Sequence, residues 1–156
     1  TFNHKKSYLL IFLKYFIFII LITNLVLIST IGIHELGHVG AAYVSKCYYR
    51  TILFEEGSYP YTEILCGIGA DNIMVSAAGP LLPIIIALLL FFAGGTFIKD
   101  ISLLIIGFDL IASYRDLAEI GVSESINFVF MAVGLVFLFA GIVYLARSRI
   151  KDNLLF

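Results

Sequence analysis

One apolar run dominates the sequence and most constrains its fold. Over residues 8–45 it is interrupted by little more than Lys14 and Asn24. As a helix this run would rise by about 57 Å, almost twice the hydrocarbon thickness of a bilayer. The run is also far longer than the apolar part of a signal peptide, so we expect an uncleaved first helix. We predict one long helix that tilts or protrudes, with Asn24 as the polar position for any kink.

Three further apolar segments follow, over residues 72–93, 97–121 and 126–145. The chain has 61% hydrophobic and 13% charged residues, against about 25% charged residues in soluble domains. These segments predict an all-α integral membrane protein with about four transmembrane helices, multi-pass in the cell membrane. A formal net charge of -1 and the lack of a basic stripe give no sign of nucleic-acid binding.

Residues 47–66 are the sizeable stretch that does not resemble a membrane span. Two β-prone runs, 51–54 and 61–65, lie on either side of Gly57 to Pro60, which predicts a small β-hairpin between the first and second helices. A two-stranded hairpin is marginally stable alone, so it should rest on the membrane surface or on the helices. It is either a plain connector or an edge that offers main-chain hydrogen bonds to an extended substrate peptide.

Two cysteines, Cys47 and Cys66, flank the predicted hairpin. They can pair only if that side of the membrane is oxidising. We therefore expect two reduced, apolar thiols.

The first apolar run carries His34, Glu35 and His38. On a helix the two histidines are one turn apart, so both imidazoles can reach one cation from the same face. In this pattern two histidines hold zinc and the glutamate takes a proton from the water that the metal activates. Ionisable groups inside a membrane are costly and usually functional. The alternative is a structural polar cluster, which would need several hydrogen-bond partners.

Catalytic zinc normally takes three protein ligands, and the third apolar segment offers Asp109 and Asp116. On a helix these two are about 10.5 Å apart along the axis and on nearly the same face, so only one can sit at the metal. The expected depths of the two aspartates in the membrane do not show which of them is the ligand. The first and third segments cross the membrane in the same direction, which puts Asp116 in the same half as the histidines. Arg115 is expected to pair with Glu119 at i, i+4.

A patch of small residues, 76–80, lies near the start of the second segment, and Pro83 follows one turn later. Small residues let another helix approach closely, and prolines free backbone groups that a neighbour must satisfy. Ordinary helix packing explains such a patch more readily than direct chemistry does.

Together these motifs resemble the site-2 protease family of intramembrane zinc metalloproteases. That family has H-E-x-x-H on one helix, an A-G-P patch on the next and an aspartate ligand on a third, and residues 34–38, 78–80 and 108–116 follow the same order. The resemblance covers roughly residues 25–120. It implies that Asp116 is the third ligand and that Asp109 stands where the family has Asn. The chain departs from the family's third motif, with Ala112 in place of Pro.

The resemblance implies a single membrane-embedded metalloprotease-like domain over residues 1–156, with a core at 25–120, a hairpin at 47–66 and a C-terminal helix at 126–147. It implies a zinc endopeptidase, active in regulated intramembrane proteolysis, that cleaves a membrane-protein or peptide substrate within the lipid bilayer. Zn²⁺ would be held by His34, His38 and Asp116, with Asp109 as the alternative third ligand and Glu35 as the catalytic base. The main alternative is an inactive protease-like membrane subunit that binds partner subunits. A metal carrier would need polar residues at successive depths, which the second and fourth segments scarcely provide.

Two signals of membrane orientation disagree. The lysines and arginines expected on the side away from the metal outnumber those on the metal side, which are Lys46, Arg50 and Arg115. This tally places the metal away from the cytoplasm. The family resemblance implies the reverse.

Overall fold

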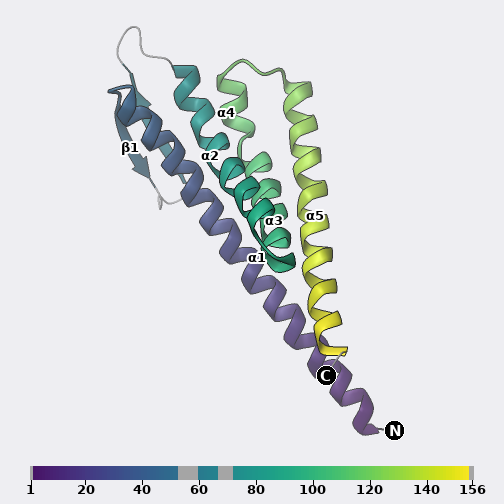
Figure 1. Ribbon diagram of the computed structural model, residues 1–156. Coiled ribbons are helices and arrows are strands. Elements are labelled where there is room, and N and C mark those ends of the chain that lie inside the picture. The colour runs from purple at the N-terminus through teal and green to yellow at the C-terminus, as the bar shows by residue number, and fades with distance from the viewer. Residues whose placement is uncertain (1, 53–59, 67–71, 155–156) are drawn as a thin grey trace.

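The computed structural model describes residues 2–52, 60–66 and 72–154. The elements in chain order are five helices and two strands: α1 (Phe2–Val44), β1 (Tyr48–Ile52), β2 (Tyr61–Leu65), α2 (Asn72–Ala93), α3 (Thr96–Ala112), α4 (Tyr114–Glu119) and α5 (Glu124–Leu154). The helices form an elongated bundle, with the hairpin at the end of the molecule where α1 finishes (Figure 1).

The predicted long first helix is confirmed, because α1 is continuous from Phe2 to Val44. Asn24 does not break it: its side-chain amide donates to the carbonyl of Ile20 at 2.8 Å, one turn back in the same helix. The C-terminal half of α1 packs along α2 and α3, whereas its N-terminal part extends beyond the rest of the bundle (Figure 1).

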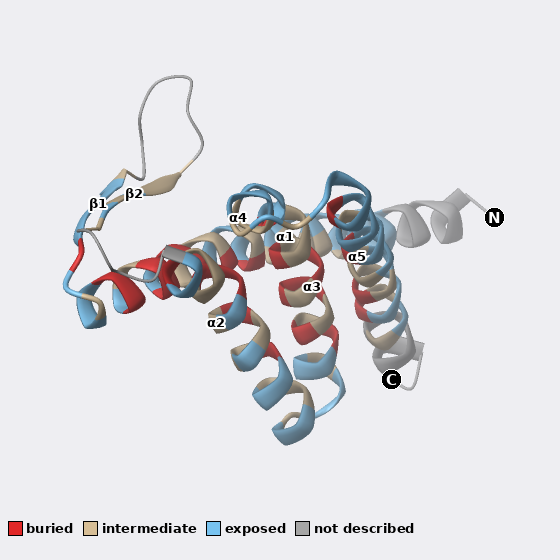
Figure 2. Ribbon diagram, turned by 90° about the horizontal axis from the view of Figure 1, so that it is seen from above, coloured by how far each residue is buried: buried red, intermediate tan, exposed pale blue. Residues whose placement is uncertain are grey.

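The interior of the bundle contains an apolar cluster as well as buried polar side chains. The buried side chains of its main cluster come from four helices, namely Val26, Ala87, Leu104, Ile105 and Leu145. Figure 2 shows buried positions on the facing sides of α1, α2, α3 and α5, with exposed positions turned outward. Many large apolar side chains occupy that outer surface, as expected for helices that contact lipid tails.

Three helices of the described part are long and apolar enough to cross a membrane, at Leu10–Val44, Ile73–Ala93 and Glu124–Ser148. The expected four spans are not confirmed, and the expectation of one continuous third helix over 97–121 is wrong. This segment divides into α3, of 17 residues, and α4, of 6 residues, with Ser113 between them. The Ser113 hydroxyl donates to the carbonyl of Asp109 at 2.6 Å, a contact to the preceding turn that commonly bends helices. The C-terminal helix extends beyond the expected 126–147 at both ends.

The expected hairpin between the first and second helices is present. β1 and β2 pair antiparallel, from Tyr48 opposite Leu65 to Ile52 opposite Tyr61. The first strand begins three residues earlier than the predicted 51–54, so that prediction was misplaced. The predicted turn at Gly57 to Pro60 lies outside the described residues except for Pro60.

The expectation of two reduced thiols is wrong, because Cys47 and Cys66 form a disulfide. The strand register explains the pairing. Tyr48 lies opposite Leu65, so the next residues outward, the two cysteines, also face each other, and their Cα atoms are 4.4 Å apart. The bond closes the open end of the hairpin just beyond the end of α1.

Candidate metal centre

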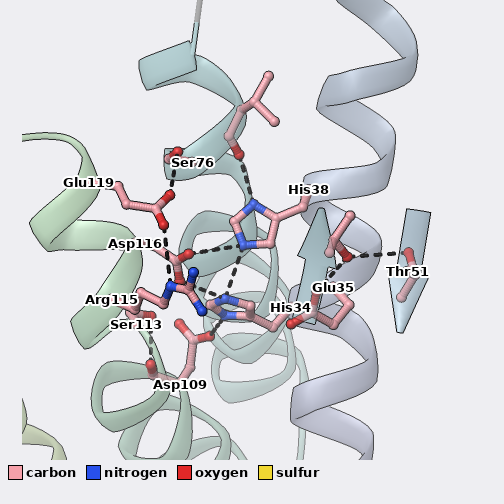
Figure 3. A network of polar contacts seen from close by, with 12 residues as sticks. His34, Glu35, His38, Thr51, Ser76, Asp109, Ser113, Arg115, Asp116 and Glu119 are labelled. Atoms are coloured by element: carbon pink, nitrogen blue, oxygen red, sulfur yellow. Dashed lines mark hydrogen bonds and ion pairs between the residues drawn. The ribbon is translucent and has the colours of Figure 1, made fainter. Parts of the chain in front are cut away.

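His34 and His38 lie on the buried face of α1, as the i, i+4 spacing predicts. Their side chains are almost fully buried, and their ring centroids are 5.0 Å apart. The two Nε2 atoms face each other at 3.3 Å. Figure 3 shows both rings pointing from α1 towards α2, α3 and α4.

The two candidate aspartates take different places around the His34 ring. Asp116 of α4 puts Oδ2 2.9 Å from Nε2 of His34 and Oδ1 3.3 Å from Nε2 of His38. Asp109 of α3 puts Oδ1 2.8 Å from the other ring nitrogen, Nδ1 of His34. His34, His38 and Asp116 therefore share one cluster, in which one potential ligand atom of each lies within 4.8 Å of the others. Asp109 approaches from the opposite side of the imidazole (Figure 3).

The contacts at Nδ1 leave Nε2 of each imidazole turned towards the cluster. A carboxylate oxygen can only accept, so Nδ1 of His34 donates to Asp109. Likewise Nδ1 of His38 donates to the main-chain carbonyl of Val75 at 2.9 Å. A neutral imidazole has one N–H. In its neutral form each ring then offers a lone pair at Nε2, and the two Nε2 atoms face each other and the carboxylate of Asp116, whereas a proton at Nε2 of His34 would be donated to Asp116.

Such groups stay close to one another when they share a positive charge, which is either a proton on an imidazole or a metal ion. The donor set of two imidazoles and one carboxylate is one that zinc takes in catalytic sites. With Zn–N and Zn–O bonds of about 2.0–2.1 Å, two tetrahedral ligands lie about 3.3 Å apart. Here the two Nε2 atoms are 3.3 Å apart, and the Nε2 atoms of His34 and His38 lie 2.9 and 3.3 Å from different oxygens of Asp116. The donor set therefore suits zinc in its chemistry, and the separation of the two Nε2 atoms matches that of two ligands of one ion.

Glycines let α1 and α2 approach closely at this point. A Cβ atom on Gly79 would lie only 2.5 Å from Cε1 and 2.8 Å from Cδ2 of His38, and one on Gly37 would overlap the main-chain carbonyl of Ala78. The small-residue patch of α2 thus packs directly against the imidazole of His38. We had expected this patch to serve only helix packing, but it also borders the candidate site.

Glu35 is also buried, 7% exposed, and it accepts a hydrogen bond of 2.5 Å from the hydroxyl of Thr62 on β2. Thr62 carries no sequence motif that marks it as part of the site. The strand's alternation could have indicated it, because Thr62 and Ile64 lie on one face of β2 and residues 61, 63 and 65 on the other.

A cavity of about 510 Å³ opens beside these side chains. Its walls come from α1, the hairpin, α2 and α4. The lining residues include His34, Glu35 and His38 of α1, Pro60, Thr62 and Ile64 of the hairpin, Ser76 of α2, and Arg115, Asp116 and Glu119 of α4. The expected pair of Arg115 and Glu119 is confirmed, with Nε 3.3 Å from Oε1. Both are well exposed at the mouth, where Ser76 also donates to Glu119.

The described residues thus form a mostly helical protein with three helices long and apolar enough to cross a membrane, and with a cluster of two buried histidines and a half-buried aspartate that could hold a metal ion. Comparisons with family models, with curated proteins and with solved structures each found no match to this chain.

Proposed function

We propose that this protein is an intramembrane zinc endopeptidase of the site-2 protease type. It would hydrolyse a peptide bond in or near a transmembrane segment of another membrane protein. The observation that carries the proposal is the convergence of the two Nε2 atoms and the Asp116 carboxylate, with Glu35 lining the same cavity.

A bound zinc ion supplies Lewis-acid chemistry, polarising a peptide carbonyl and making water more acidic. Glu35 acts as the general base: it accepts a proton from the attacking water and passes it to the leaving nitrogen. The hydrogen bond from Thr62 holds one oxygen of Glu35 and leaves the other to receive the proton. Burial of this carboxylate keeps bulk water from competing for it.

The hairpin supports an extended substrate at the same cavity. A helical substrate has its carbonyls in its own hydrogen-bond ladder, so it must unwind before attack. Within the described residues β2 pairs with β1 alone, and its residues line the cavity. An unwound segment that adds to the free edge of β2 would present its carbonyls beside Glu35.

The test uses purified protein loaded with zinc and reconstituted with synthetic transmembrane peptides, whose fragments are identified by mass spectrometry. The parent should produce fragments. Glu35→Gln should bind zinc equally but cleave at least a hundredfold more slowly, as expected on loss of a general base. Glu124→Gln, at the start of α5 and outside the cavity, is the matched control and should cleave like the parent. Equal cleavage by Glu35→Gln and the parent would refute the proposal. A zinc-loaded parent with no activity would favour the inactive subunit.

We also propose that the metal centre lies nearer the non-cytoplasmic side of the cell membrane. The disulfide lies at the end of α1 next to the site, and disulfides persist mainly in oxidising compartments. The excess of basic residues at the opposite end of the bundle agrees with this orientation. A membrane-impermeant maleimide applied to intact expressing cells should label Glu124→Cys but not Lys99→Cys. The reverse labelling would overturn the orientation without affecting the proposed chemistry.

A further inference from the structure

Asp109 is the most deeply buried carboxylate near the metal cluster, with no exposed surface. Oδ1 accepts the hydrogen bond from Nδ1 of His34 at 2.8 Å, whereas Oδ2 has no hydrogen-bond partner among the described residues. A buried carboxylate that lacks a partner at one oxygen is costly for folding. Its side chain therefore serves His34 rather than a wider structural network.

The two imidazoles differ in what holds them. Nδ1 of His38 donates to a neutral main-chain carbonyl, that of Val75, whereas Nδ1 of His34 donates to a carboxylate. A carboxylate at this position fixes the ring and makes its other nitrogen a stronger electron-pair donor. That other nitrogen, Nε2 of His34, faces Asp116 at 2.9 Å and His38 at 3.3 Å.

We propose that Asp109 is a positioning residue for a divalent metal: it is not a ligand, but it orients His34 and strengthens the metal's bond to Nε2. This inference rests on the proposed metal site. The charge of Asp109, and not only its capacity to accept a hydrogen bond, sets the affinity of the site. Asparagine retains an acceptor oxygen and loses the charge, so it separates the two contributions.

The experiment measures the zinc affinity of the purified full chain by competition with a chromophoric chelator. We expect Asp109→Asn to bind about tenfold more weakly than the parent and Asp109→Ala up to about a hundredfold more weakly. The matched control is Asp100→Asn, the same change at another buried aspartate of α3, which lies away from the cluster. It should retain the parent affinity.

A second readout reports the hydrogen bond itself. In protein with ¹⁵N-labelled histidine, the Nδ1 proton of His34 should resonate far downfield, as protons shared with a carboxylate do, and should move upfield in Asp109→Asn. Parent-like zinc affinity in Asp109→Asn, or equal losses in Asp109→Asn and Asp100→Asn, would overturn the inference. A parent that binds no zinc would instead refute the metal site itself, so the two failures are distinguishable.

Discussion

Gly79→Ala tests whether the close approach of α1 and α2 determines the geometry of the metal centre. The added Cβ atom would lie under the His38 ring, 2.5 Å from Cε1 and 2.8 Å from Cδ2. Atoms do not approach so closely, so either the imidazole or the helix must move. A functional site tolerates displacements of only about 0.5 Å. The imidazole is the more mobile of the two, and its movement takes Nε2 away from His34 and Asp116.

The size of the effect follows from the cost of overpacking. One extra carbon in a packed interior costs about 1–3 kcal/mol. If the His38 ring takes up the whole strain, zinc binding weakens by the same free energy, which is about five- to 150-fold in the dissociation constant. If the helices separate instead, the loss appears in the free energy of unfolding. Alanine gains about 1 kcal/mol over glycine in a helix, and that gain offsets part of the loss.

Gly40→Ala is the matched control, because a Cβ atom there meets nothing within 4 Å. It should bind zinc like the parent and unfold at an equal or slightly higher temperature. The measurements are chelator competition for zinc and thermal unfolding in detergent, both made with and without the metal. Parent-like zinc affinity and stability in Gly79→Ala would refute the close-packing argument.

Two other substitutions separate metal binding from catalysis. Asp116→Ala removes one of the three proposed ligands, so the purified protein should lose its stoichiometric zinc in elemental analysis; full retention would argue against Asp116 as a ligand. Thr62→Val removes the hydrogen bond to Glu35 and should lower kcat by about tenfold or more, as expected for a hydrogen bond to a charged group, with unchanged zinc content. Thr96→Val, the same change at an exposed residue at the start of α3 and outside the cavity, should leave kcat unaltered, and equal rates for the two variants would contradict the role of Thr62.

Local periodicity was enough to predict much of this molecule. The continuous α1 and the shared face of His34 and His38 follow from apolar length and from 3.6 residues per turn. The small residues around Gly79 also indicated a close helix contact. The disulfide was not predictable in the same way. It depends on the register of two short strands, and the sequence placed the first strand three residues too late.

The choice between Asp109 and Asp116 shows why the site itself could only be narrowed down. A spacing of seven residues puts both carboxylates on one helix face, and that face meets a single imidazole with two nitrogen atoms. Each aspartate takes one nitrogen: Asp109 takes Nδ1 and Asp116 takes Nε2. The interruption at Ser113 separates the helical turns that carry them. Which nitrogen faces the second histidine depends on the rotamer of His34 and on how α3 packs against α1. The spacing of residues in the sequence determines neither the rotamer of His34 nor the packing of α3 against α1. It could therefore identify both aspartates but could not assign their roles.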